Sequence, residues 1–325
     1  MAVFTLAAGE DGTNNTFGFR LPRYVDLLLI CSRIAALSMA GPDDPTAKDD
    51  FERFQTGVAK YAAYLETPEG RLRIDLALAN LQEFLPQPPQ PLRALDLGGG
   101  TGAVSVRLAR LGFHVTLLDA SVPMLEFAER AAREAGITEG ITLKRGDVGE
   151  LPSLFDAGSL DVDSFDVILC HNVLEFVDDP RAVLRTAARA LRGPSGILSV
   201  LVRTQSGEVL KAALQEGDLA AAEHSLTAEW GNESLYGGKV RLFTGEGLRA
   251  MMVESSLAVT AERGVRIVTD YLPSRISRSD EYEQIFELER KLGRHPEFAA
   301  VARYRQCLAR RAPPVIKSPV MKDVP

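Results

Sequence analysis

Short apolar runs of strand length alternate with helix-compatible segments through the middle of the chain. The runs lie at residues 92–97, 113–118, 141–145, 165–170 and 197–202. Leu, Val and Ile dominate most of them, which is typical of strands buried on both faces of a parallel sheet. Because helix-compatible segments separate the runs, the pattern predicts a doubly wound α/β sheet whose ligands bind beyond the carboxyl ends of the strands.

The rest of the predicted domain, residues 49–311, is arranged around this core at 92–202. Residues 49–91 contain two segments with helical periodicity, 51–64 and 71–84, and a Pro-rich stretch follows the second. We expect residues 203–311 to contain a helical insertion on the substrate side and the last strands of the sheet. There we expect strand material at 259–268 with a turn at Gly264, a helix at 281–292 and a final antiparallel strand at 304–309. We expect residues 1–48 to be a poorly ordered extension and residues 312–325 a disordered tail.

The composition indicates a globular protein with an ample core. Of the 325 residues 46% are hydrophobic and 25% charged, and the apolar run Leu27–Cys31 is too short to span a bilayer. A net charge of −7 argues against broad electrostatic binding of nucleic acid, but it is compatible with a local basic patch. The cysteines Cys31, Cys170 and Cys307 lie far apart without metal-ligand spacing. We therefore expect a reducing, cytoplasmic location, no bound metal and no membrane partner.

A glycine-rich loop follows the first of the predicted strands. Gly98, Gly99, Gly100 and Gly102 fall within five residues, and a helix-compatible segment begins directly after them. A strand, a glycine turn and a helix place a nucleotide-type cofactor over the helix N-terminus. Asp96, two residues before the loop, suits the ammonium of an amino-acid moiety better than a pyrophosphate. The loop therefore favours S-adenosylmethionine, with a nicotinamide dinucleotide as the alternative.

Candidate ligand groups end the next three strands. Asp119 is positioned to accept hydrogen bonds from both ribose hydroxyls, unless it is only the N-terminal acid of the following helix. Asp147 can accept from an adenine amine while Val148 covers the ring, or it is simply a turn aspartate. His171 follows the fourth strand. Because the carboxyl ends of parallel strands share one edge, we expect these side chains to lie together.

These motifs resemble class I S-adenosylmethionine-dependent methyltransferases over residues 92–202. A wider resemblance, over residues 51–310, is to the bacterial tRNA 5-carboxymethoxyuridine methyltransferases, which esterify the carboxylate on a modified wobble uridine. The segments that carry it are TPEGRLR (67–73), LDLGGGTG (95–102), CHNVLEFVDDPRAVL (170–184), GVRIVTDYL (264–272) and the helical tail 282–305. The resemblance implies a seven-stranded Rossmann-like sheet with N-terminal helices and a helical insertion after strand five. The cofactor contacts it implies are Arg73, Gly98, Gly99, Asp119, Asp147, Val148 and His171.

The insertion after the fifth strand departs from a member of this family that carries a lysine run there. Residues 206–238 are rich in acids, and Lys211 is the only Lys or Arg among them. A polyanionic tRNA needs cations that neutralise its phosphates. A small acidic substrate is therefore the alternative partner to tRNA. The alternative functions are a small-molecule carboxyl or O-methyltransferase and a non-catalytic S-adenosylmethionine-binding protein.

The chemistry of methyl transfer needs alignment more than it needs a catalytic side chain. A carboxylate is already ionised at neutral pH, so esterification requires no general base. We therefore predict no catalytic residue and assign His171 to cofactor positioning, with a base role as its alternative. Cys170 is interpreted as a buried strand residue rather than a nucleophile.

Candidate substrate groups follow the fifth strand. Arg203 is expected to face the pocket, and with Lys239, Arg241 and Arg266 it forms a predicted anion-binding rim. Tyr271 is a candidate for stacking on a base. The alternatives are solvated arginines and a core tyrosine.

Overall fold

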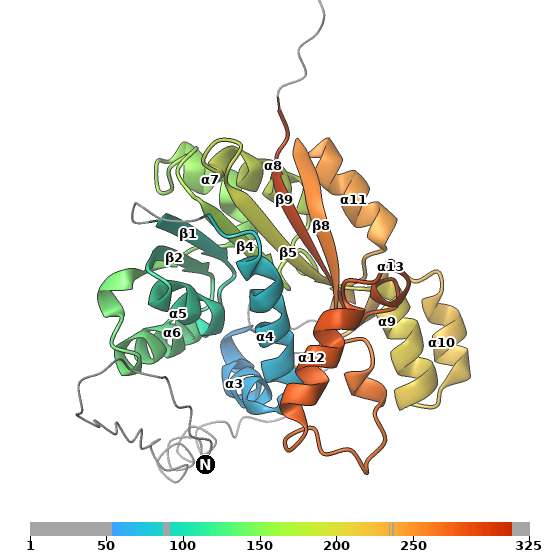
Figure 1. Cartoon of the computed structure of the whole chain (residues 1–325). Coiled ribbons are helices and arrows are strands. Elements are labelled where there is room, and N and C mark those ends of the chain that lie inside the picture. The colour runs from blue at the N-terminus through green and yellow to red at the C-terminus, as the bar shows by residue number, and fades with distance from the viewer. Residues whose placement is uncertain (1–53, 87–91, 234, 236, 314–325) are drawn as a thin grey trace, which may run out of the picture. The chain divides into compact units, whose positions relative to one another are not determined.

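The computed structural model describes residues 54–86, 92–233, 235 and 237–313 (Figure 1). Predictions for residues 1–48 and for nearly all of the C-terminal tail lie outside the described residues. Within the described ranges, no helix combines the length and the apolar character needed to cross a membrane.

A seven-stranded sheet organises the fold in the order β3-β2-β1-β4-β5-β9-β8. Its strands are β1 (Leu92–Leu97), β2 (Phe113–Asp119), β3 (Ile141–Arg145), β4 (Val167–His171), β5 (Ile197–Arg203), β8 (Leu257–Val265) and β9 (Tyr304–Arg311). The first five are parallel, whereas β9 is antiparallel to both β5 and β8. The predicted fold class is confirmed. Strands β1 to β3 are added toward one edge of the sheet and β4 and β5 toward the other, so the strand order switches between β1 and β4. Doubly wound folds bind their ligands at this switch point.

Helices cover both faces of this sheet (Figure 1). Helices α4, α5, α6 and α12 pack on one face, and α7, α8 and α11 pack on the other. The helices and the small second sheet are α3 (Val58–Glu66), α4 (Pro68–Gln82), α5 (Ala103–Arg110), α6 (Val122–Glu134), α7 (Leu151–Asp156), α8 (Pro180–Ala190), α9 (Gln205–Leu210), α10 (Leu219–Ser225), β6 (Trp230–Asn232), β7 (Lys239–Arg241), α11 (Gly245–Glu254), α12 (Tyr282–Leu292) and α13 (Pro296–Ala299).

Helix α4 is docked onto the sheet by an apolar stripe. Leu72 and Leu76 are almost fully buried against Leu201 and Val265 of the sheet. Burying such a side chain stabilises the fold by roughly 1.5–3 kcal/mol, so the two leucines fix the position of the helix. The helix begins at Pro68, earlier than the predicted start at residue 71, because the Thr67 hydroxyl caps it.

The prediction of a turn at Gly264 is wrong. Gly264 lies inside β8, a single continuous strand, where its N–H donates to the carbonyl of Gly293. A Cβ at this position would come within 2.8 Å of the Ala299 Cα. The glycine is needed for this close approach between backbones rather than for a change of direction.

Candidate active site

A cavity of about 460 Å³ lies where the carboxyl ends of the parallel strands meet. Among the residues that line it are Arg73, Gly98, Gly100, Asp119, Asp147, Val148, His171 and Arg203, all predicted as site residues. Tyr61, Asn172, Glu175, Glu233 and Tyr304 also line it and were not predicted. The glycine loop, the three strand ends and the candidate acceptor groups therefore share one space.

The glycine loop needs residues without side chains. Gly98 has a φ of 63°, and a Cβ there would lie 2.6 Å from Val173 Cγ2. Gly100 also has a positive φ, and its N–H donates to Asp119 Oδ2 at 2.8 Å. Asp119 Oδ1 accepts the N–H of Ser121, the residue that caps α6. Asp119 thus ties the loop to the helix start, and each oxygen retains a lone pair for a ligand hydroxyl.

Asp96 and Gly99 are not among the residues that line the cavity. Asp96 is buried behind the loop, where Ser105 Oγ donates to it at 2.7 Å. Burial raises the pKa of Asp96 to about 7, against the opposing effect of the Ser105 hydrogen bond. A Cβ on Gly99 would lie 2.9 Å from Asp96 Oδ2 and 2.5 Å from Leu117 Cγ. These two residues shape the loop from behind.

Asp147 and Val148 form the start of a short 3-10 turn, Val148–Glu150. Asp147 is exposed, and its Oδ1 accepts the N–H of Gly149 at 2.7 Å, as a turn aspartate does. The side chain of Val148 is buried at the cavity wall. The arrangement offers an apolar surface beside a carboxylate.

A relay of hydrogen bonds links helix α4 to His171. Gln306 Nε2 donates to the carbonyl of Ala77 and to Ser199 Oγ, both at 2.9 Å, and Gln306 Oε1 accepts from Asn80. Ser199 Oγ is in turn hydrogen-bonded to His171 Nε2, 2.8 Å away. Burial, together with the charge of Arg73, lowers the pKa of His171 to about 3.

Arg73 is held at the cavity by polar and aromatic neighbours. Its Nη1 donates to Asn172 Oδ1 at 2.7 Å, and its Nη2 donates to the Tyr61 hydroxyl at 3.1 Å. Asn172 has a φ of 54°, a conformation that Asn tolerates better than most residues. The guanidinium also lies over the Tyr64 and Tyr304 rings, 5.3 and 5.7 Å from their centroids.

Positive charge surrounds Tyr304 on the side of the cavity next to β5. Burial opposes ionisation of this phenol, but the nearby Arg203, Arg266, Arg73 and Arg303 outweigh it and lower the pKa of Tyr304 to about 8. Glu175 is the buried acid of this region, and burial raises its pKa. Its Oε1 accepts the N–H of Arg203 at 2.8 Å, whereas its Oε2 has no hydrogen-bond partner in the described part of the chain.

The structure does not bring the predicted anion-binding rim together. Arg203 lines the cavity, whereas Arg266 is buried outside it in an ion pair with Asp270 and donates to the Tyr64 hydroxyl. Lys239 and Arg241 flank Val240, which does line the cavity.

Arg241 and Tyr271 were both predicted to contact the substrate. The Arg241 guanidinium stacks over Trp230, 4.9 Å from the ring centroid. Tyr271 is not among the cavity residues, and burial raises the pKa of its phenol to about 12. The predicted base-stacking tyrosine therefore lies away from the cavity that holds Arg203.

The order of the strands, the antiparallel β9 between β5 and β8, the glycine loop after β1 and the carboxylate at the end of β2 are the arrangement of S-adenosylmethionine-dependent methyltransferases. The chain belongs to the methyltransferase domain family, whose model matches residues 70–262. It is an S-adenosylmethionine-dependent methyltransferase.

Relatives of known activity agree with this assignment. The chain is 28% identical over 253 residues to the tRNA 5-carboxymethoxyuridine methyltransferase of Escherichia coli K12, which covers 75% of this chain and 90% of that protein. It is 35% identical over 127 residues to a ubiquinone biosynthesis O-methyltransferase of Caulobacter vibrioides, which covers 39% and 46%. The first likeness extends through the insertion, whereas the second is confined to part of each chain.

Solved structures share the fold. The CcbJ methyltransferase of Streptomyces caelestis matches 82% of this chain and all of its own, with a TM-score of 0.55 and 16% identity. A Thermotoga maritima methyltransferase, described as a possible histamine N-methyltransferase, matches 80% of this chain with a TM-score of 0.53 and 18% identity. At these identities the likeness is one of fold alone.

The residues of the cavity fit the cofactor. S-adenosylmethionine supplies an electrophilic methyl group when it is bound. The glycine loop presents backbone without side chains, Asp119 presents carboxylate lone pairs, and Val148 presents an apolar wall. Together with Asp147, His171 and Arg73, they are the groups that would hold it.

Proposed function

We propose that this methyltransferase esterifies the carboxylate of a modified wobble uridine in tRNA, with no side chain acting as general base. The state of His171 carries this proposal. Its Nε2 is hydrogen-bonded to Ser199 and its pKa is lowered to about 3, so the ring is neutral and only a weak base. An acceptor that is already ionised needs no proton removed.

The charge on the acceptor side favours an anion. Arg73, Arg203 and Tyr304 line the same cavity, and the arginines there are strong enough to lower the pKa of a buried phenol. A carboxylate is a good partner for such a site because a guanidinium can bind both of its oxygens.

The choice of tRNA rests on the extent of the likeness to the Escherichia coli enzyme. That relative is matched over 253 residues and 90% of its length, which is more than the cofactor core at residues 92–202 can account for. The acceptor-side residues Glu233 and Tyr304 lie in this later part of the chain. The cofactor core alone would not distinguish acceptors.

The test is methyl transfer to tRNA from a strain that makes the carboxymethoxyuridine acid but lacks its ester. Nucleosides would be resolved by mass spectrometry after incubation with labelled S-adenosylmethionine. We expect the methyl ester at the wobble uridine. Calorimetry with S-adenosylhomocysteine is the control, because intact binding without transfer would remove tRNA as the acceptor.

A small carboxylic acid or alcohol is the second candidate acceptor. The acidic insertion favours it, because the carboxylates of residues 206–238 repel the phosphates of a tRNA. The same assay distinguishes the two candidates. An enzyme that methylates small molecules would leave the tRNA unlabelled and would instead label a small molecule in an acid extract.

A further inference from the structure

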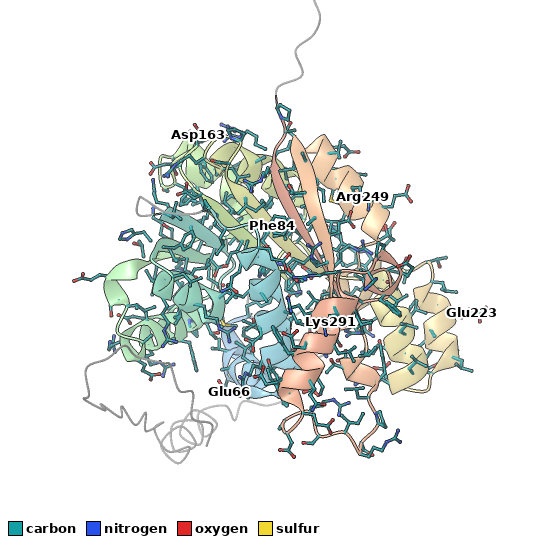
Figure 2. The ribbon with its side chains drawn as sticks, viewed as in Figure 1. Glu66, Phe84, Asp163, Glu223, Arg249 and Lys291 are labelled. Carbon is teal, nitrogen blue, oxygen red and sulfur yellow. The ribbon has the colours of Figure 1, made fainter. Side chains whose placement is uncertain are left out.

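A second cavity, of about 760 Å³, lies apart from the catalytic one, beside the edge strand β8 and the helices α11 and α13. Four arginines line it, and we call it the arginine groove: Arg249, Arg263, Arg294 and Arg305. Figure 2 labels Arg249 on α11 at this side of the sheet. None of these residues belongs to the cofactor cavity.

The negative charge of the acids around the groove does not fully neutralise the positive charge of its arginines. Glu262 pairs with both Arg249 and Arg305, at 2.5 Å in each case. Glu83 likewise pairs with both Arg263 and Arg294. Glu246 is the other acid in the lining, so three carboxylates face four guanidinium groups among the described residues. This local excess of positive charge occurs in a chain whose net charge is −7.

Two buried donors in the groove lack partners. The Nε atoms of Arg263 and Arg305 are buried and make no hydrogen bond within the described ranges. Buried N–H groups without an acceptor cost stability, so native structures satisfy nearly all of them. Both guanidinium groups lie in the wall of the groove, where their charge acts on a ligand although these Nε atoms are covered.

The start of α11 adds to the positive potential. Gly245, its first residue, lies so close to Arg305 that a Cβ there would be 2.7 Å from the Arg305 Cζ. The N-terminus of a helix carries a partial positive charge, so a guanidinium at this place is unfavourable by itself. An anion between the two would be attracted by both.

We propose that the arginine groove binds phosphate groups of the acceptor RNA, next to the nucleotide that is methylated. A phosphate offers oxygens to several guanidinium groups at once, and the groove is larger than a carboxylate requires. The inference rests on the proposed RNA acceptor.

The position of the groove suits this role. Tyr304 lines the catalytic cavity and Arg305, the next residue of β9, lines the groove. Consecutive strand residues point to opposite faces, so the two cavities lie on either side of one strand. A single polynucleotide is long enough to contact both.

The test uses the double variant Arg249→Gln/Arg294→Gln. These side chains are 54% and 40% exposed, so loss of their ion pairs leaves the fold intact. We expect the KM for tRNA to rise roughly tenfold at about 0.1 M salt with kcat unchanged, and its salt dependence to weaken. The matched control is Arg133→Gln, an arginine that is 65% exposed and paired with Glu129.

Two further measurements separate the outcomes. A modified nucleoside without flanking phosphates should be methylated equally by the wild type and the double variant. Titration with inorganic phosphate, followed by calorimetry, should show binding to the wild type that the double variant lacks. Phosphate binding with an unchanged KM for tRNA would overturn the RNA assignment and indicate a free phosphorylated ligand.

If the double variant matches the wild type in both phosphate binding and KM for tRNA, the groove is not a phosphate site. Failure of the proposed function is distinguishable from this result. A wild type that methylates no RNA would overturn the RNA acceptor, and the phosphate titration would still decide whether the groove binds the anion.

Discussion

Arg203 Nη2 lies 2.7 Å from Glu233 Oε2 in the wall of the catalytic cavity, and both side chains are buried. Glu233 comes from the acidic insertion, directly after β6. The arginine best placed to receive an acceptor carboxylate is therefore already bound to a carboxylate of the chain itself. An incoming acid must displace Glu233 or share the guanidinium with it.

Replacement of Glu233 by Gln should tighten acceptor binding. Gln retains the shape but not the charge, so Arg203 becomes available and the KM for an acidic acceptor should fall roughly fivefold. The free energy of unfolding should fall by about 1–3 kcal/mol, because a buried ion pair loses one charge. The measurements are initial rates and urea unfolding. Glu229→Gln, an exposed acid in the same insertion, is the control. A rise in KM would mean that Glu233 orients Arg203 for the acceptor.

The ionisation of Tyr304 should limit activity at alkaline pH. With a pKa of about 8, the phenol becomes an anion above that pH and repels an acceptor carboxylate. We expect kcat/KM to fall as the pH rises through 8 in the wild type and to stay level in Tyr304→Phe. Release of S-adenosylhomocysteine is the suitable readout, since it does not depend on survival of the ester. The same alkaline fall in both proteins would assign it to another group.

The same phenol should make folding stability depend on pH. Its pKa is lower in the folded chain, about 8, than the ordinary 10, so the unfolded chain binds more protons between these values. Stability therefore rises with pH across this window and is lost as the pH falls through 8. The full gain is about 3 kcal/mol. Urea unfolding of the wild type and Tyr304→Phe at pH 7 and pH 10 would test the difference.

Removal of the imidazole in His171→Ala should weaken S-adenosylhomocysteine binding about tenfold, because a hydrogen-bonding group at the cavity is lost. Turnover at saturating cofactor should change much less, since the ring is not a base. Calorimetry and single-turnover rates measure the two effects separately. Unchanged affinity with collapsed turnover would restore the general-base role.

Gly98→Ala should lower the free energy of unfolding far more than a glycine substitution whose only cost is backbone strain. Gly98 combines a positive φ with a Val173 side chain that would lie 2.6 Å from an added Cβ, whereas Gly136 has a φ of 68° and nothing within 4 Å. Gly136→Ala should cost about 1 kcal/mol, and Gly98→Ala should cost about 1–3 kcal/mol more and weaken cofactor binding. Equal unfolding energies for the two variants would remove the collision with Val173 from the explanation.

The cofactor side of the cavity could be predicted from sequence because local geometry determines it. The strand, the glycine loop and the acid Asp119 are close in the chain, and parallel strands bring their carboxyl ends to one edge. The acceptor side depends on packing between distant segments. Tyr61 and Tyr304 meet Arg73 only after α3, α4 and β9 have assembled, and no spacing in the sequence indicates this.

Arg266 and Tyr271 were predicted to bind the substrate but do not line the cavity, and each has a physical reason. Arg266 is already paired with Asp270, which follows only four residues later in the chain. Tyr271 lies in a 3-10 turn, Thr269–Tyr271, whose first residue is held by the buried Glu289. The nearby acid Asp270 was a signal in the sequence that Arg266 had a partner of its own.

The relay that ends at His171 begins on α4, at the backbone carbonyl of Ala77. A carbonyl can only accept, so Gln306 must turn its Nε2 toward it, and the same Nε2 also donates to Ser199 Oγ beside His171. The same helix carries Arg73, whose charge lowers the pKa of His171. A methyltransferase core of the same design without this helix would lose that charge, and its more basic histidine would give access to acceptors that must first be deprotonated.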